Sequence, residues 1–279
     1  MHFKYQVSWL SELLKCNASD STSLTKRQCE DKNMNNARVI ILDLDGTVYQ
    51  GNRLIGGADE FIEKMRSFGL RILFCTNNSS KPRSSIAKKL VELGIPCIEE
   101  DVISSGFMAV QYIISNDLKK VYVSGTEEFR MEFQKCGVDL VDETETDNLV
   151  LSMDMNFNYS KMTKAVRAAL KSKKIIICNR DKLFPKEDGI YPGCGAMVAS
   201  VLFCSDRKAD IVLGKPSTHM LEYASKITGY PANKMIVIGD SLESDIAMAE
   251  AYGSPSILIG SKREGGLWAT TLKEIVEWD

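Results

Sequence analysis

The 279-residue sequence has few of the residues that build zinc sites, and it has no long apolar run. It contains only two histidines, and none of its eight cysteines forms a Cys-x-x-Cys pair, so a structural zinc site is not indicated. No run approaches the roughly 18 apolar residues that a membrane-spanning helix needs. The formal net charge is only −2, which indicates no general affinity for nucleic acid or for an anionic membrane surface. We therefore expect neither of these partners.

The cysteines also bear on the compartment. In a chain of this length, scattered cysteines favour reduced thiols, and so predict a cytoplasmic protein. The first 36 residues are mostly polar, and they lack the apolar core and the cleavage site of a signal peptide. We interpret residues 1–36 as a flexible N-terminal extension.

Five short apolar runs predict buried strands. They do not alternate apolar with polar residues, which is typical of a parallel sheet covered on both faces. Apolar residues at helical spacing lie between some of these runs. Phe61, Met65 and Phe68 lie in this way between the first run and the second. The pattern predicts a doubly wound α/β core. The runs are Val39–Leu42, Ile72–Cys75, Ile211–Leu213, Met235–Ile238 and Ile257–Ile259.

One interval between strand ends is too long for a single crossover. From Thr76 to Lys215 is 139 residues, whereas the other two intervals, of 33 and 25 residues, each fit one βαβ unit. Apolar runs inside the long interval predict strands of their own at Val121–Val123, Leu149–Leu151 and Ile175–Cys178. We therefore predict a core domain at residues 37–116 and 206–279, with an inserted α/β cap domain at 117–205.

Polar residues follow four of the predicted core strands, in the segments LDLDG, LFCTNNS, VLGKP and VIGDSLESD. In an open α/β sheet, ligands bind beyond the carboxyl ends of the strands. Carboxylates there need a compensating cation, and hard oxygen ligands suit Mg²⁺. We expect these side chains to meet in one crevice: Asp43, Asp45, Thr76, Asn77, Lys215, Asp240 and Asp245.

These residue types suit phosphoryl transfer. Asp43, at the strand tip, can attack phosphorus and form an aspartyl-phosphate, and Asp45 can act as general acid and then as general base. Lys215 can balance the charge of the phosphate, while the Thr76 hydroxyl and the amides near Asn77 can donate to phosphate oxygens. Each segment alone has an ordinary structural explanation, such as a turn or a helix cap. Their combination, order and spacing point to shared chemistry.

That combination resembles the haloacid dehalogenase superfamily of phosphatases over residues 37–279. DLDGT at 43–47 matches its nucleophile motif, Thr76 its second motif, Lys215 its third, and Asp240 with Asp245 its fourth. The resemblance implies that Asp43 is the nucleophile, and that the residue two positions on is the general acid/base.

The resemblance also implies a metal site. Its ligands would be the carboxylates of Asp43 and Asp240 and the backbone carbonyl of Asp45. Asp245 would act through water or by orienting Lys215.

FCTNNSSKPR at 74–83 and IIICNRDKLFP at 175–185 resemble the NagD-like or 4-nitrophenylphosphatase branch. That branch carries an α/β cap between the second and third motifs, and it implies a small phosphate ester as substrate and a homodimer through the caps. Cys75 and the segment SMDMNFNYS depart from the branch pattern, so the ester stays open: a nucleotide, a sugar phosphate or a similar compound.

Three consecutive residues of the insert are candidates for substrate contact. Asn179, Arg180 and Asp181 follow a predicted strand, and Arg180 would suit a second anionic group on the substrate. A solvated loop explains these residues equally well.

Several other activities use similar residues. Asp45 disfavours dehalogenation, and a phosphomutase usually has a smaller cap before its second motif. Phosphonate hydrolysis would need a cap lysine that forms a Schiff base, and among Lys161, Lys164 and the other lysines of the insert nothing singles one out. A non-catalytic phosphoacceptor uses clustered aspartates and a lysine, but has no need of a large insert. We therefore predict a Mg²⁺-dependent phosphatase that acts on a small phosphomonoester through phospho-Asp43.

Overall fold

The computed structural model describes residues 37–186, 189–263 and 266–276, and the predicted extension at 1–36 lies outside them. Contacts between Cα atoms divide the chain into two compact units, which we describe separately. Of the described residues, the first unit contains 37–75, 90–96 and 221–276, and the second contains 76–89 and 97–220. The cap boundaries of 117 and 205 stay a prediction.

The first unit contributes five parallel strands, in the order β14-β13-β12-β1-β4, to a six-stranded sheet. Every residue of β1 is buried, which explains why its sequence does not alternate. The predicted α/β fold with a parallel sheet is confirmed. The strands are β1 (Val39–Leu42), β4 (Arg71–Thr76), β12 (Met235–Gly239), β13 (Ser256–Ile259) and β14 (Leu267–Ala269).

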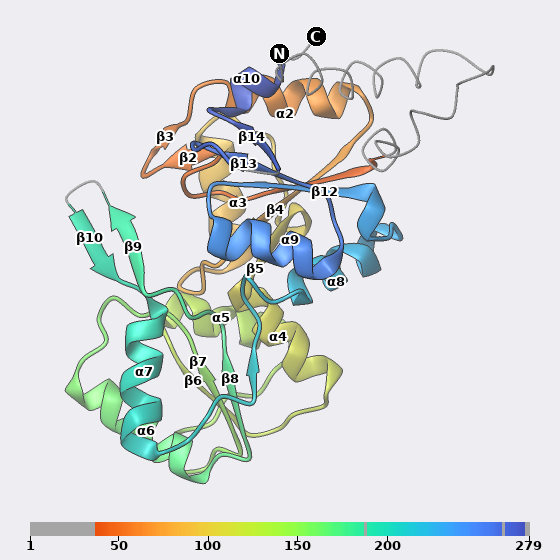
Figure 1. Ribbon diagram of the computed structural model, residues 1–279. Coiled ribbons are helices and arrows are strands. Elements are labelled where there is room, and N and C mark those ends of the chain that lie inside the picture. Colours follow the sequence, from red (N-terminus) through yellow and green to blue (C-terminus); the bar gives the residue numbers. More distant parts are fainter. Residues whose placement is uncertain (1–36, 187–188, 264–265, 277–279) are drawn as a thin grey trace. The chain divides into compact units, whose positions relative to one another are not determined.

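Helices cover both faces of this sheet, with α2 and α10 side by side on one face and α9 on the other (Figure 1). In α2, Phe61 and Met65 of the predicted helical pattern are buried, together with Ile62, whereas Phe68 is the C-cap residue and is half-buried. The helices and short elements of this unit are α2 (Ala58–Ser67), α8 (His219–Thr228, shared with the second unit), η4 (Ala232–Lys234), α9 (Ala247–Tyr252), α10 (Leu272–Val276) and the hairpin of β2 (Tyr49–Gln50) and β3 (Arg53–Leu54).

The second unit has its own parallel sheet, with strand order β11-β8-β7-β6. Alternate residues such as Leu149, Leu151, Ile175 and Ile177 pack in a core with residues of α6 and α7. The elements are α3 (Arg83–Glu92, shared with the first unit), η3 (Glu99–Asp101), β5 (Val102–Ser104), α4 (Ser105–Ser115), β6 (Val121–Ser124), α5 (Glu127–Lys135), β7 (Asn148–Leu151), α6 (Tyr159–Lys171), β8 (Lys174–Ile177), β9 (Leu183–Lys186), β10 (Gly189–Pro192), α7 (Cys194–Ser205) and β11 (Ile211–Val212).

One predicted core strand belongs to the other sheet. The run Ile211–Leu213 was expected beside the catalytic strands, but β11 pairs in parallel with β8 of the second unit. Asp210 explains the pairing, because its carboxylate accepts a hydrogen bond from the Ile175 amide at 2.7 Å and its own amide donates to the Ile175 carbonyl. A run of three apolar residues carries no information about which sheet it joins, so the prediction for this strand was wrong.

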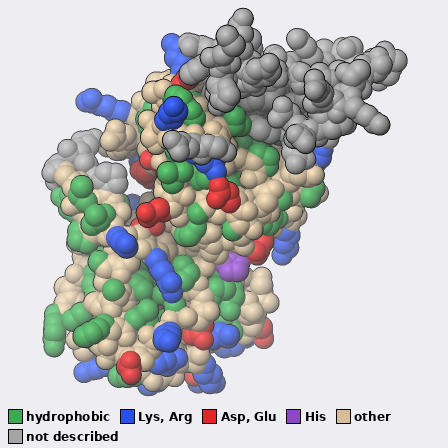
Figure 2. Space-filling view, in the orientation of Figure 1, with side chains coloured by type: hydrophobic (Ala, Val, Ile, Leu, Met, Phe, Trp, Pro, Cys, Tyr) green, Lys and Arg blue, Asp and Glu red, His purple; other side chains and the backbone are tan. Residues whose placement is uncertain are grey.

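Apolar side chains also reach the surface of the second unit, over the β9–β10 hairpin and near α6 (Figure 2). They include Leu170, Ile190 and Phe203, which are more than half exposed. Within the described ranges, no helix combines the length and apolar character that crossing a bilayer requires. The homodimer implied by the resemblance stays a prediction.

Candidate active site

Two aspartates follow neighbouring strands of the first unit. β1 and β12 are parallel, with Leu42 opposite Ile238, and the Asp43 amide continues the ladder by donating to the Ile238 carbonyl at 2.9 Å. Asp240 follows β12 directly. The carboxyl ends of both strands therefore bring Asp43 and Asp240 to one edge of the sheet, as predicted from the sequence.

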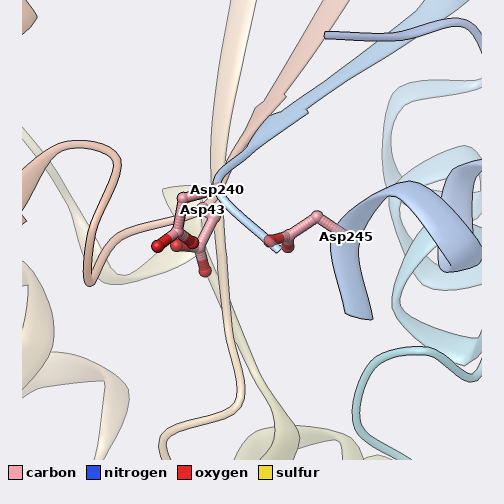
Figure 3. A group of neighbouring side chains, drawn as sticks. All are labelled: Asp43, Asp240 and Asp245. Carbon is pink, nitrogen blue, oxygen red and sulfur yellow. The ribbon is translucent and has the colours of Figure 1, made fainter. Parts of the chain in front are cut away.

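A third carboxylate joins them. Ligand oxygens of Asp43, Asp240 and Asp245 all lie within 4.8 Å of one another (Figure 3). Asp245 lies in the turn η5 (Leu242–Ile246), where its Oδ2 accepts a hydrogen bond from the Ser241 amide at 3.2 Å. The sequence indicated only a supporting role for Asp245, whereas the structure places its carboxylate in the same group as the other two.

This group fits a divalent cation. Like charges this close disfavour their common ionised state unless a positive charge lies among them. Three carboxylates offer hard oxygen ligands, which Mg²⁺ prefers over nitrogen or sulfur. Asp43 and Asp245 are buried while Asp240 is exposed, so the group has one side open to solvent.

Glycine at position 46 leaves space for one of these carboxylates. A Cβ atom on Gly46 would lie 2.1 Å from Asp240 Oδ2, which is far inside van der Waals contact. Gly46 also has φ of +91°, in the left-handed region that other residues rarely adopt. The turn that follows β1 therefore requires glycine for two separate reasons.

Asp45 lies in the same turn, but its carboxylate is not part of the three-carboxylate group found among the described residues. Tyr49 Oη donates to Asp45 Oδ2 at 3.4 Å. Burial raises the pKa of the Tyr49 hydroxyl, and the negative charges of Asp45 and Asp43 raise this pKa further, so the group stays a proton donor. Sequence reasoning missed Tyr49, although its place four residues after Asp45 was a usable signal.

In the second unit, Asn77 joins segments that are far apart in the sequence. Its Oδ1 accepts from the Lys215 amide at 2.8 Å, and its Nδ2 donates to the Lys215 carbonyl at 3.1 Å and to Asp181 Oδ1 at 2.9 Å. Thr76, the preceding residue, is buried, and its hydroxyl accepts from the Asn78 amide at 3.1 Å. The Asn77 side chain, predicted to help bind phosphate, is thus engaged with protein atoms.

The three candidates for substrate contact differ in their surroundings. Asn179 is buried, with its Nδ2 donating to the Asn77 carbonyl at 2.7 Å and its Oδ1 accepting from the Asp181 amide at 3.2 Å. Arg180 is exposed. Contact between these residues and substrate stays a prediction.

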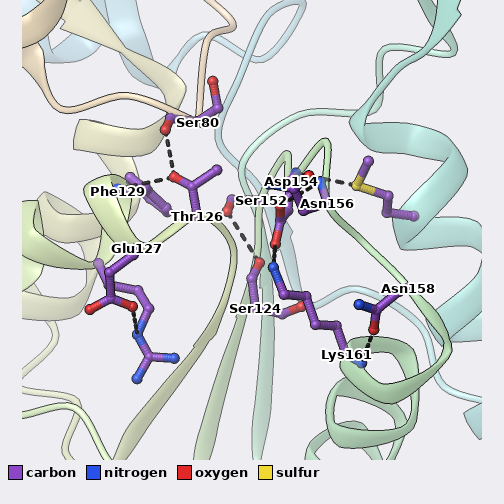
Figure 4. A network of polar contacts seen from close by, with 12 residues as sticks. Ser80, Ser124, Thr126, Glu127, Phe129, Ser152, Asp154, Asn156, Asn158 and Lys161 are labelled. Atoms are coloured by element: carbon purple, nitrogen blue, oxygen red, sulfur yellow. Dashed lines mark hydrogen bonds and ion pairs between the residues drawn. The ribbon is translucent and has the colours of Figure 1, made fainter.

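The two lysines named above for phosphonate chemistry are both ion-paired. Lys161 lies 2.6 Å from the buried carboxylate of Asp154 (Figure 4), and Lys164 lies 3.7 Å from Glu143. Figure 4 also shows Asn158 beside Lys161, where the Asn158 side chain accepts from the Lys161 amide at 3.0 Å. Neither lysine is distinguished as a nucleophile.

The structure therefore places the predicted site residues in two sets. The first unit holds Asp43, Asp45, Asp240 and Asp245, and the second holds Thr76, Asn77, Lys215 and the segment 179–181. The meeting of the two sets in one crevice stays a prediction.

Apart from the segment 179–181, the residues of both sets fall within segments that match known families. The family model for haloacid dehalogenase-like hydrolases matches residues 40–139, and a second model for HAD-like hydrolases matches residues 212–271. Among curated relatives, the sugar-phosphatase AraL of Bacillus subtilis is 36% identical over 230 residues, which cover 81% of this chain and 85% of that protein. The 5'-nucleotidase YutF of the same organism is 31% identical over 220 residues, covering 78% and 85%.

Solved structures agree with these relatives. The 4-nitrophenylphosphatase of Thermotoga maritima superposes with a TM-score of 0.82 at 27% identity, covering 87% of this chain and 97% of that one. The p-nitrophenyl phosphatase of Archaeoglobus fulgidus gives 0.81 at 28% identity, covering 87% and 99%. The chain therefore belongs to the haloacid dehalogenase-like hydrolases, in their NagD-like and 4-nitrophenylphosphatase branch, and is a phosphoric monoester hydrolase.

Proposed function

We propose that this chain is a Mg²⁺-dependent phosphatase that hydrolyses a small phosphomonoester through a phospho-Asp43 intermediate. The observation that carries the proposal is the group of carboxylates of Asp43, Asp240 and Asp245 at the strand ends. Relatives named as a sugar-phosphatase and a nucleotidase support sugar phosphates or nucleotides as the substrate class. That every relative cited above is named as a phosphatase or nucleotidase argues against a non-catalytic phosphoacceptor.

In this proposal, the Asp43 and Asp240 carboxylates and the Asp45 backbone carbonyl hold the metal ion, and Asp245 supports them. When bound, Mg²⁺ supplies positive charge that offsets the repulsion between an anionic nucleophile and an anionic phosphate. The open position of Asp240 beside the buried Asp43 suits an ion that must face a substrate.

The residues of the chain then perform two displacements. An Asp43 carboxylate oxygen attacks phosphorus, and the bond to the ester oxygen breaks as that oxygen takes a proton from Asp45. Asp45 next takes a proton from a water molecule, which attacks the aspartyl-phosphate, releases inorganic phosphate and restores Asp43. Tyr49, which donates to Asp45 Oδ2, orients the carboxyl group that moves these protons.

The second set supplies the positive charge and the donors. In the proposal, Lys215 balances the charge of the phosphate, and the Thr76 hydroxyl with the amides around Asn77 donates to its oxygens. Arg180 is exposed and makes no ion pair with any residue that the structure describes, which suits a second anionic group on the substrate.

Replacing the nucleophile tests the covalent mechanism. Asp43→Asn should lower kcat by about 10³-fold or more, because an amide cannot form the aspartyl-phosphate, and circular dichroism should show an unchanged fold. Released phosphate is measured over a panel of nucleotides, sugar phosphates, phosphoglycolate, glycerol phosphate and pyridoxal phosphate. Asp59→Asn, at an exposed aspartate of α2, is the matched control. Hydrolysis retained by Asp43→Asn would refute the phospho-Asp43 intermediate.

Metal removal tests the cofactor. EDTA should abolish hydrolysis, and Mg²⁺ added in excess over the chelator should restore it, because the carboxylate group needs the cation to admit an anionic substrate. Full activity in EDTA would rule out the metal assignment while leaving the test of the nucleophile intact.

A further inference from the structure

The side chain of Asn77 contacts both polar groups of one distant peptide unit. A primary amide has an acceptor oxygen and two N–H donors. In Asn77, the oxygen accepts from the Lys215 amide at 2.8 Å, while the nitrogen donates to the Lys215 carbonyl at 3.1 Å. The Lys215 N–H is a donor only, so it fixes which end of the Asn77 amide faces it. Two contacts to one residue determine its orientation as well as its position.

Asn77 is itself held in place. Its carbonyl accepts from Ser105 Oγ and from Asn179 Nδ2, both at 2.7 Å. Its second amide hydrogen goes to Asp181 Oδ1 at 2.9 Å. Asn179 is buried and its own oxygen is also bonded, so the Asn77 carbonyl is held by a side chain that is itself fixed.

Gly214 brings the chain close enough for these contacts. A Cβ atom at position 214 would lie 2.6 Å from Asn77 Oδ1 and 2.5 Å from the Cys178 carbonyl oxygen. Any side chain there would therefore push Asn77 away from the Lys215 amide. The glycine before Lys215 is explained by this close approach.

Lys215 lies beyond the last residue of β11. β11 ends at Val212, and the last ladder contact is from the Leu213 amide to the Ile177 carbonyl at 3.0 Å. The residue after Lys215 is Pro216, which has no N–H to donate. The flexible four-carbon stem of a lysine needs a fixed starting point if its ammonium group is to be placed reproducibly.

We propose that Asn77 is a positioning residue for Lys215: its side chain fixes the main chain from which the ammonium group extends, and it does not itself bind phosphate. The clamp consists of Asn77 with its supports Ser105, Asn179 and Asp181. The inference rests on the proposed function, in which Lys215 balances charge on the phosphate.

A double-mutant cycle tests whether Asn77 acts through Lys215. Asn77→Ala should lower kcat/KM by about 10- to 100-fold, as loss of a supporting residue does in other sites. In the Lys215→Ala background, the same change should cost less than about twofold, because the group it places is gone. An equal loss in both backgrounds would show that Asn77 acts independently of Lys215 and would overturn the proposal.

Asn158→Ala is the matched control. It is the same replacement in the same unit, and it removes one side-chain hydrogen bond, to the Lys161 amide at the start of α6. In each background, its kcat/KM should stay within about twofold of the parent that carries Asn158, which is the wild type in one case and Lys215→Ala in the other. Asn77→Ser, whose hydroxyl cannot span both polar groups of Lys215, is a second variant with the same expectations as Asn77→Ala.

Hydrogen exchange at the Lys215 amide supplies a readout that does not depend on turnover. The N–H loses its acceptor in Asn77→Ala, so its exchange rate, measured by NMR, should rise at least about tenfold, while Asn158→Ala leaves it unchanged. An unchanged exchange rate of the Lys215 amide in Asn77→Ala would overturn the proposal that Asn77 fixes the main chain at Lys215. If the wild type hydrolyses no phosphate ester, the proposed function fails, and the exchange rates still decide whether Asn77 holds Lys215.

Discussion

Gly46 lies in the turn after the strand that carries Asp43, and two constraints act on it. Its backbone is left-handed at φ of +91°, and a Cβ atom would overlap the Asp240 carboxylate. Gly69 has a similar backbone, with φ of +77°, but no atom lies within 4 Å of the place where its Cβ would be. Comparing alanine variants at Gly46 and Gly69 therefore distinguishes the effect of a left-handed backbone from the effect of overlap with the Asp240 carboxylate.

Both Gly46→Ala and Gly69→Ala should lower stability, but only Gly46→Ala should also weaken the response to Mg²⁺. Gly69→Ala should lower the free energy of unfolding by about 1–2 kcal/mol, the cost of a left-handed alanine. Gly46→Ala should in addition displace Asp240 and raise the Mg²⁺ concentration for half-maximal activity by about 10-fold or more. Urea unfolding and Mg²⁺ titrations of activity measure the two effects. Equal Mg²⁺ requirements in both variants would contradict the role given to Asp240.

At the scale of elements, α5 holds the segment that follows Thr76. Thr126, the N-cap of α5, accepts from the Phe129 amide at 3.1 Å and donates to the Ser80 carbonyl at 2.6 Å (Figure 4). Ion pairs from the same helix reach Lys81, through Glu128, and Arg83, through Glu132. The Arg83 guanidinium also stacks over the Phe107 ring, 3.5 Å from its centroid. The helix therefore fixes this loop at several points.

Thr126→Ala should lower the free energy of unfolding by about 2 kcal/mol, because it removes the helix cap and the bond to Ser80 together. Thr126→Ser retains the hydroxyl and should recover most of this loss. Urea unfolding curves measure both, with Asn158→Ala, the loss of an N-cap alone, as the reference at about 1 kcal/mol. A smaller loss for Thr126→Ala than for Asn158→Ala would mean that the bond to Ser80 contributes nothing.

The elements also show what a sequence can and cannot predict. Fully buried strands were the easiest to predict, because burial on both faces leaves an unbroken run of apolar residues. The runs Val39–Leu42 and Met235–Ile238 identified β1 and β12 in this way, and hence Asp43 and Asp240, which follow these strands. β11 was assigned to the wrong sheet, since two or three apolar residues do not specify a neighbour. The bond from the Lys215 amide to Asn77 spans 138 residues, and no local pattern reports such a contact.

At the scale of the whole molecule, two buried thiols couple stability to pH. Burial raises the pKa of Cys178 and of Cys194, the latter from 9.0 to about 12. The folded state therefore keeps protons that the unfolded chain loses above about pH 9. The stability that these protonated thiols contribute is complete below pH 9 and is lost as the pH rises towards 12.

The free energy of unfolding should fall above pH 9 by about 1.4 kcal/mol per pH unit for each such thiol. Cys194→Ala should reduce this slope by the contribution of one thiol, about 1.4 kcal/mol per pH unit, whatever its effect on the free energy of unfolding at neutral pH. Cys204→Ala, at an exposed cysteine of α7, is the matched control, and the difference in slope between the two variants is the quantity to measure. Identical slopes would contradict the raised pKa of Cys194.

The clamp at Asn77 holds backbone atoms of Lys215 and none of its side chain. The anchoring of position 215 is therefore separate from the chemistry carried there. We expect Lys215→Arg to keep the two bonds between position 215 and Asn77 while it changes the reach and the shape of the cationic group, so the place of the positive charge can be varied without moving the peptide that carries it.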